Sequence, residues 1–132
     1  MCKQFSDAAT STFAQATAAQ YLQAGGLPGA LAKVRPVYAQ RARTMVEALG
    51  RDCGDAVSFV APGGGLFVWA RLTAPNADAA AFAKRAIEQG VAFVPGAPFF
   101  AQNPDRASFR LSFATVAQDK IREGVAKLAQ AL

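Results

Sequence analysis

The chain has 132 residues, of which 52% are hydrophobic and 17% charged, so it holds enough apolar material for one folded domain, and wholesale disorder is excluded. Fourteen lysines and arginines against nine acidic residues give a net charge of +5. This charge is spread along the chain, which allows an anionic partner but does not require one. Histidine is absent, which excludes Ser–His and Cys–His catalytic pairs.

The two cysteines, Cys2 and Cys53, form no CxxC pair and no disulfide framework. With no histidine, they also argue against a metal site. The first residues lack the apolar stretch of a signal peptide, and no apolar run approaches the ~20 residues of a membrane span. We therefore expect a soluble, cytoplasmic protein without a metal.

A first helix is predicted over residues 6–24, with Ser6 or Asp7 as its cap and Gly25–Gly26 as its end. Its apolar stripe is weak, so we expect part of it to pack on something outside this chain. Pro28 stands where the first turn of the next helix is expected, and Pro36 should kink that helix or mark its true start. The predicted end is at Gly50 and Gly54, and the shared apolar face is Val34, Val37, Tyr38, Met45 and Leu49.

Two strands, residues 57–60 and 66–72, are joined by a linker containing Gly63–Gly65, which predicts an antiparallel hairpin. A strand follows the glycines and no lysine accompanies them. The linker therefore favours a tight turn with positive φ over a phosphate-binding loop, although glycine also lets backbone pass close to a ligand.

A third helix is predicted between Asn76, as its cap, and Gly90, as its end. Residues 91–94 then form a compact apolar strand, and the loop that follows carries Phe99 and Phe100. These two rings fit a lid or a pocket wall, but the pattern alone favours a loop that packs into the local core. The apolar face of the helix is predicted to be Ala79, Phe82, Ala83, Ala86 and Ile87.

Residues 108–113 alternate strictly, with Phe109, Leu111 and Phe113 on one face and Ser108, Arg110 and Ser112 on the other. Thr115 and Gln118 are placed as a capping box for a last helix. That helix has an apolar face of Ile121, Val125, Leu128 and Leu132. The element order α-α-β-β-α-β-β-α predicts an α+β fold with a small, largely antiparallel sheet covered by helices on one side.

Arg110 is the first candidate for a binding residue. A guanidinium held on a strand and flanked by small serines offers a carboxylate two parallel hydrogen bonds. The pattern fits a surface arginine on a solvated sheet face at least as well. No lysine has surroundings that indicate a lowered pKa, and no pair of carboxylates has a spacing typical of acid–base catalysis.

Three segments resemble a known family. Residues 62–69, PGGGLFVW, resemble the P-x-G-G-x-F-x-W strand pair of fold-type I, pyridoxal-phosphate-dependent aminotransferases. Residues 90–99, GVAFVPGAPF, resemble the G-V-x-x-x-P-G-x-x-F segment, and residues 110–113 with 121–125 resemble the closing R-L-S-F and I-x-E-G stretch. The similarity is to 2-aminoadipate and kynurenine type aminotransferases and equally to the aminotransferase-like half of MocR-type (GntR family) transcriptional regulators.

The resemblance implies that Arg110 binds the α-carboxylate of an amino acid or 2-oxo acid substrate, and that Phe67 and Phe99 line the substrate pocket. Gly64 and Gly65 belong to the same substrate-binding motif. The family reaction exchanges an amino group between an amino acid and a 2-oxo acid, with the cofactor as electron sink. A fixed arginine contributes to it by orienting the substrate.

The resemblance covers only the smaller, C-terminal domain of the family, so residues 1–132 are expected to be that domain, with residues 1–27 leading out of a missing large domain. The family's cofactor lysine and the residues around its phosphate belong to that large domain. We therefore expect pyridoxal phosphate in the full-length parent, but no catalytic residue, cofactor binding or turnover in this fragment. An isolated small domain exposes apolar surface, so a homodimer is expected.

Two other functions remain open. The chain fits the ligand-sensing domain of a MocR-type regulator, with DNA contacts made by another domain. An RNA-binding sheet is also conceivable from the β-β-α-β-β-α order and the net charge. RNA platforms place aromatic and basic residues on one face, whereas Phe109 and Phe113 lie opposite Arg110. We therefore expect no direct contact with nucleic acid and no contact with a membrane.

Overall fold

The computed structural model describes residues 9–132, and the chain divides into two compact units after Pro36. The first unit contains α2 (Thr12–Gln23), in which no residue is buried. Ser11 caps this helix by accepting a hydrogen bond from the Ala14 amide at 3.4 Å. The helix therefore begins later than predicted, and the expected caps Ser6 and Asp7 lie outside the described residues.

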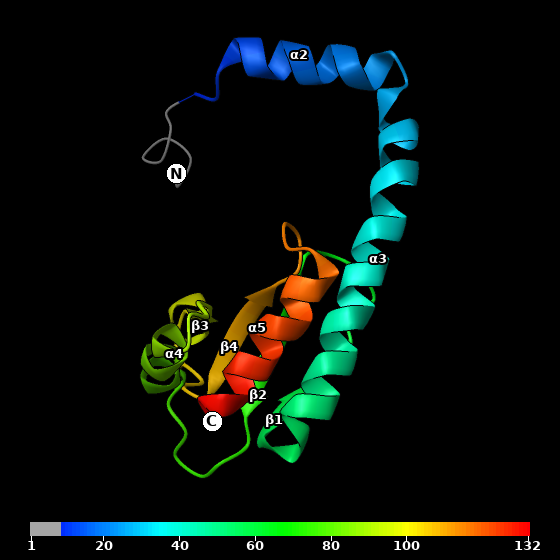
Figure 1. Cartoon of the computed structure of the whole chain (residues 1–132). Coiled ribbons are helices and arrows are strands. Elements are labelled where there is room, and N and C mark those ends of the chain that lie inside the picture. Colours follow the sequence, from blue (N-terminus) through cyan, green and yellow to red (C-terminus); the bar gives the residue numbers. More distant parts are fainter. Residues whose placement is uncertain (1–8) are drawn as a thin grey trace. The chain divides into compact units, whose positions relative to one another are not determined.

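The predicted break after the first helix is confirmed, because Gly25 adopts a φ of +72°, which side chains disfavour. The next helix, α3 (Gly26–Asp52), crosses the division between the two units (Figure 1). It begins before Pro28 and continues through both Pro36 and Gly50. Pro36 therefore does not mark the start of the helix, and the alternative, a kink at Pro36, stays a prediction. Of the two glycines predicted to end the helix, Gly50 lies inside it, whereas Gly54, with a φ of +50°, follows its last turn as predicted.

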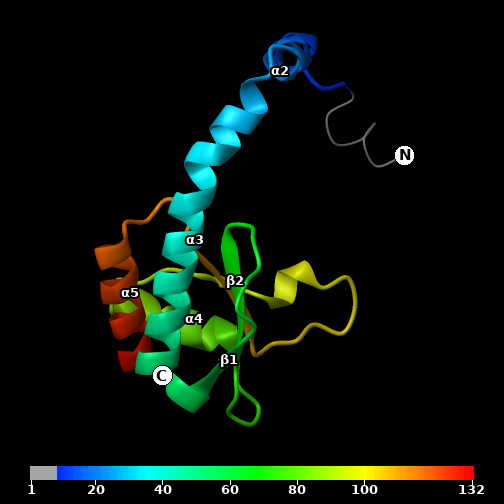
Figure 2. The same cartoon turned by 90° about the vertical axis from the view of Figure 1, so that its right-hand side faces the viewer.

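The second unit, residues 37–132, contains an antiparallel sheet with the strand order β1-β2-β4-β3. Residues 37–52 of α3 lie with α4 and α5 on one side of the sheet, and the loop with the short helix η2 lies on the other (Figure 2). This confirms the predicted α+β class and element order. The elements are β1 (Val57–Phe59), β2 (Phe67–Leu72), α4 (Ala79–Glu88), β3 (Val94–Pro95), β4 (Ser108–Ser112) and α5 (Gln118–Gln130), with 3-10 turns η1 (Gly54–Ala56) and η2 (Ala97–Phe99).

The core lies between the helices and one face of the sheet. The predicted alternation is confirmed, because Phe109, Leu111 and Phe113 are buried. Phe82 from α4 packs on Phe93 and Phe109 with ring centroids 5.1 and 5.6 Å apart. The same alternation in β2 buries Val68, Ala70 and Leu72, which leaves the intervening side chains on the opposite face.

The start of α4 differs from the prediction. Asp78, not Asn76, is the cap, and its carboxylate accepts hydrogen bonds from the Ala80 and Ala81 amides at 2.8 and 3.3 Å. Asn76 has a φ of 57°, outside the extended conformation of a capping residue. A hydrogen bond from the Arg106 guanidinium, together with the helix amides, lowers the pKa of Asp78.

The C-terminal part of α4 ends as predicted, but its apolar face and the strand that follows it differ from the prediction. Gly90, with a φ of +79°, follows the helix end as predicted. Ile87, however, is 62% exposed, so the predicted apolar face is too wide by this residue. The strand predicted over residues 91–94 is reduced to Val94–Pro95, because the Val91 amide donates to the Ala86 carbonyl at 2.9 Å and completes the helix terminus.

The predicted capping box of α5 is also wrong. Its N-cap is Ala117, which makes no side-chain hydrogen bond. The Gln118 side chain instead accepts a hydrogen bond at 3.0 Å from the Thr44 hydroxyl of α3, and Arg41 donates to the Ala114 carbonyl. Ile121, Val125 and Leu128 are buried as predicted, whereas Leu132 is 43% exposed. The start of α5 is therefore joined to α3 by side-chain hydrogen bonds, and no side chain caps its first amides.

Glu123 on α5 gives the unfolding of the protein a specific pH dependence. Hydrogen bonds from Lys120 and Lys127, at 2.7 and 2.8 Å, lower the pKa of its carboxyl from 4.5 to about 2. A depressed pKa stabilises the fold above the ordinary value, and that contribution is lost as the pH falls toward the folded value. The melting temperature of Glu123→Gln should therefore lie below that of the wild type above about pH 5 and converge with it near pH 2.

Thermal unfolding measured from pH 2 to pH 7 tests this expectation. Glu88→Gln is the control, since it removes an exposed carboxylate that makes no ion pair within residues 9–132. A constant difference between Glu123→Gln and the wild type over the whole range would contradict the role of ionisation.

None of the helices in residues 9–132 is both long and apolar enough to cross a membrane. Nor do residues 9–132 bring three or more histidine, cysteine, aspartate or glutamate side chains together as a metal site requires.

Candidate functional site

The sheet face opposite the helices, here called the open face, carries an aromatic cluster around one arginine. The cluster consists of Phe67 and Trp69 of β2 with Phe99 and Phe100 of the loop after β3, and their exposed fractions are 40%, 41%, 50% and 39%. Since such large rings are usually covered, their exposure together marks this face as the candidate binding surface.

Arg110 lies within this cluster, as the middle residue of β4. Its guanidinium carbon is 4.2 Å from the centroid of the Phe67 ring and 4.6 Å from that of Phe99. These are cation–π distances, and the rings restrict the motion of the side chain. Within residues 9–132 the guanidinium makes no hydrogen bond and no ion pair, so its N–H groups are available to a ligand.

The structure thus brings together three of the five residues predicted for the site. Phe67 and Arg110 come from adjacent antiparallel strands, where Phe67 pairs with Ser112 and Trp69 pairs with Arg110. Phe99 comes from η2, which belongs to the connection between β3 and β4. The expectation that the Phe99–Phe100 loop packs into the local core is wrong, since both rings remain on the open face.

Gly64 and Gly65 lie in the linker that leads into β2. Gly65 has a φ of +79°, which confirms the turn, and the next residue, Leu66, accepts a hydrogen bond from the Phe113 amide at 3.1 Å. A Cβ atom at either glycine would meet no other atom within 4 Å. In this structure Gly65 is therefore needed for its backbone conformation, while nothing in the described chain approaches Gly64.

Trp69 and Phe100 belong to the same surface but were not among the predicted site residues. Trp69 contacts Phe99 edge to face, with ring centroids 5.7 Å apart and planes at 78°, and contacts Phe100 at 6.1 Å. The alternation of β2 contained the signal, because Trp69 stands two residues after Phe67 and must share its face.

Ser108 departs from the expected polar face, because it is fully buried. Its hydroxyl donates to the Asp105 carbonyl at 2.8 Å. Its backbone carbonyl accepts a hydrogen bond from the Gly96 amide at 2.7 Å, and a Cβ at Gly96 would collide with the Ser108 hydroxyl oxygen. A glycine is therefore required at position 96, where the loop that carries Phe99 begins.

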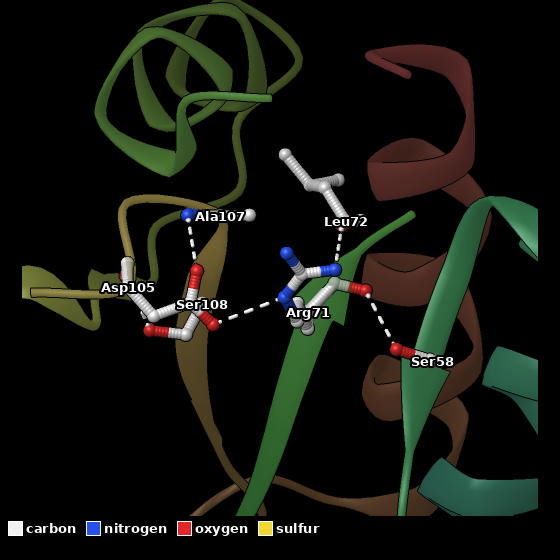
Figure 3. A network of polar contacts seen from close by, with 6 residues as sticks. All are labelled: Ser58, Arg71, Leu72, Asp105, Ala107 and Ser108. Atoms are coloured by element: carbon white, nitrogen blue, oxygen red, sulfur yellow. Dashed lines mark hydrogen bonds and ion pairs between the residues drawn. The ribbon is translucent and has the colours of Figure 1, made fainter. Parts of the chain in front are cut away.

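A second arginine, Arg71 at the end of β2, is held differently. Its Nε donates to Asp105 at 3.0 Å and its Nη1 to the Leu72 carbonyl at 3.4 Å (Figure 3). Asp105 also accepts from the Ala107 amide at 3.1 Å. Arg71, Asp105 and Ala107, together with the Arg106–Asp78 pair, line a cleft of about 580 Å³. Arg71 and Arg106 each form an ion pair with an aspartate, whereas the guanidinium of Arg110 has no such partner within residues 9–132.

The lysines of the described chain do not fit a covalent pyridoxal phosphate site. Lys84, Lys120 and Lys127 belong to α4 and α5, on the side of the sheet away from the open face (Figure 2). The Glu123 carboxylate raises the pKa of Lys120, the opposite of what an amine nucleophile requires. Lys33 lies in the first unit. Arg110 and its rings can bind and orient a carboxylate, but these residues supply no anchor for the cofactor.

Comparison with known proteins agrees with the fold and with the segments around Arg110. Residues 3–128 match the family "Aminotransferase class I and II". The chain therefore belongs to this family of aminotransferases.

Three relatives illustrate the match. The chain is 37% identical to aromatic-amino-acid aminotransferase 1 of Thermococcus litoralis over all its 132 residues, which are 31% of that protein. It superposes on LysN, the α-aminoadipate aminotransferase of Thermus thermophilus complexed with N-(5'-phosphopyridoxyl)-L-leucine, with a TM-score of 0.85 and 39% identity over 99% of this chain and 33% of that one. It also superposes on the kynurenine aminotransferase of Pyrococcus horikoshii, with a TM-score of 0.87 and 36% identity, over 98% of this chain and 32% of that one.

The chain thus spans about a third of the length of these relatives. Regulators also match: the chain is 32% identical over 120 residues to the HTH-type transcriptional regulator TauR of Rhodobacter capsulatus, with 89% of this chain and 24% of that protein covered.

Proposed function

We propose that this chain is the small domain of a pyridoxal-phosphate-dependent aminotransferase and that Arg110 binds the α-carboxylate of its amino acid and 2-oxo acid substrates. The observation that carries the proposal is the Arg110 guanidinium, placed against two phenyl rings with no carboxylate partner in residues 9–132. The family match and the similarity to aminotransferases of three kinds support it.

The role of the chain is binding and orientation. A guanidinium offers a carboxylate two parallel charge-assisted hydrogen bonds, and these fix both the position and the rotation of the substrate. Phe67 and Phe99 shield the guanidinium from water on the sides that they cover, which strengthens its interaction with an anion. The glycine turn at Gly65 sets the direction in which β2 leaves the linker and presents Phe67.

In this proposal the large domain that carries the cofactor is the partner of the open face, because a substrate bound at Arg110 must also reach the cofactor. The homodimer expected from the sequence remains part of the proposal. The first unit has exposed apolar side chains that a partner could cover, among them Phe13 and Leu22 of α2.

The lysine positions yield a test on the chain itself. Mixed with pyridoxal phosphate and then dialysed, residues 1–132 are expected to retain no visible absorbance of a lysine-bound cofactor, since the lysines of the second unit lie on the helical side of the sheet. The full-length parent is expected to retain it and to transfer amino groups from α-amino acids to a 2-oxo acid. Retention by the isolated chain would contradict this division of roles.

A regulator is the second candidate, and the similarity to TauR favours it. In that case the same arginine binds an amino acid as a signal, and a helix–turn–helix domain elsewhere in the parent reads DNA. Sequencing the whole parent gene and assaying its product for transamination and for binding of its own promoter separates the candidates. Turnover without DNA binding supports the enzyme, and DNA binding released by an amino acid supports the regulator.

A further inference from the structure

The loop that carries Phe99 depends on few contacts with the sheet. It leaves β3 at Pro95 and rejoins the sheet at Ser108, where the hydrogen bond between Gly96 and Ser108 holds its first residue. Asp105 holds its last residues through Arg71 and Ala107. Between these two ends, the backbone hydrogen bonds of Phe99 and Phe100 are local to the η2 turn.

The contacts that join this middle part to β2 are the rings of Phe99 and Phe100 against Trp69, at 5.7 and 6.1 Å. The indole packs edge to face on Phe99, an arrangement that fixes the direction of both rings. Trp69 also stands directly opposite Arg110 in the register of β2 and β4. The same β2 residue is thus both the cross-strand neighbour of Arg110 and the support of the ring that touches it.

We infer that Trp69 is a positioning residue, which holds the Phe99 ring against the Arg110 guanidinium and so keeps its hydrogen-bonding edge in one orientation. Trp69 acts through Phe99, which contacts both the indole and the guanidinium. Phe67 needs no such support, because it stands on β2 itself. The structural part of the inference is independent of ligand; its consequence for substrate binding rests on the proposed function.

Nuclear magnetic resonance of the full chain measures the contact directly. Protons near an aromatic face are shifted upfield by the ring, so the Arg110 Nε–H signal, assigned by its loss in Arg110→Lys, is expected to report both rings, because Nε is bonded to the guanidinium carbon that both rings contact. Trp69→Leu is expected to remove the same part of the upfield shift as Phe99→Leu, whereas Trp69→Phe is expected to keep most of it. The part due to Phe67 is expected to remain in all three variants.

Controls separate positioning from unfolding. The methyl and ring signals of the core around Phe82 and Phe109 should be unchanged in each variant, since Trp69 lies on the opposite sheet face. Should Trp69→Leu fail to fold, Trp69→Val, which suits an exposed strand position, repeats the measurement. An Arg110 signal at its wild-type position in the folded Trp69 variant, together with a displaced signal in Phe99→Leu, would overturn the inference.

Kinetics of the full-length parent test the functional consequence. Trp69→Leu is expected to raise the KM for amino acids by about two- to tenfold, the range of one aromatic pair, with kcat less affected and Trp69→Phe restoring most of the loss. If Arg110→Lys leaves KM unchanged, the proposed function fails while the ring-current result stands. If the Trp69 variants leave the upfield shift of the Arg110 signal unchanged, the positioning role of Trp69 is rejected, while the proposed role of Arg110 in binding substrate is unaffected.

Discussion

Exchanging Arg110 for lysine is expected to lower kcat/KM of the full-length parent by about 10- to 100-fold for every α-amino acid, mainly through KM. Lysine keeps the charge but replaces a planar fork with a single ammonium, so one of two parallel hydrogen bonds to the carboxylate is lost. The Phe67 and Phe99 rings contact the guanidinium of Arg110. A lysine ammonium is expected to lie in a different position against these rings, because it is smaller than a guanidinium.

Arg71→Lys is the matched control for this experiment. Arg71 lies on the neighbouring strand and is also partly exposed, but its guanidinium is committed to Asp105 and to the Leu72 carbonyl. Its exchange is expected to change KM by less than about twofold, because exposed ion pairs contribute little. Equal KM values for Arg110→Lys and the wild type would reject the binding role of Arg110. If the parent is a regulator, the dissociation constant of the amino acid replaces KM as the readout.

Phe82→Ala is expected to lower the free energy of unfolding by about 3–5 kcal/mol, a large part of the stability of a domain of this size. Phe82 is fully buried and joins α4 to the sheet through Phe93 and Phe109, at ring distances of 5.1 and 5.6 Å. Its truncation leaves a cavity that the surrounding rings cannot fill without shifting. Urea unfolding followed by circular dichroism measures the loss.

Ile87→Ala on the same helix is the control, because the sequence pattern assigns Ile87 to the buried face and the structure exposes 62% of it. The expected change is within about 0.5 kcal/mol, as is typical of surface positions. A loss from Ile87→Ala as large as that from Phe82→Ala would mean that the helix packs on the face that the sequence pattern indicates.

Much of the site follows from local rules. Strict alternation in residues 108–113 places Arg110 on the face opposite the buried phenylalanines, and alternation in β2 places Phe67 and Trp69 on that same face. Pattern alone did not distinguish Arg110 from any solvated arginine. Only the resemblance to aminotransferases singles out Arg110 as the residue predicted to bind a carboxylate, and the family match confirms the family and not this role.

The element ends show why other predictions were wrong. Asp78 caps α4 together with Arg106, 28 residues away, while Thr44 binds Gln118, 74 residues away, where a local capping box was predicted. Capping rules read only the few residues around a helix end. They cannot detect a partner that arrives from a distant segment.

By itself, the sequence determined the class of fold, the order of the elements and the sheet face on which Arg110 stands, because these depend on the spacing of apolar residues and on glycines such as Gly25 and Gly65 with positive φ. Only the tertiary structure decided that Phe99 meets Arg110 and that Trp69 contacts Phe99, since the η2 loop must first return across the sheet. Contacts of this kind are set by how a connection folds back, which no local periodicity encodes.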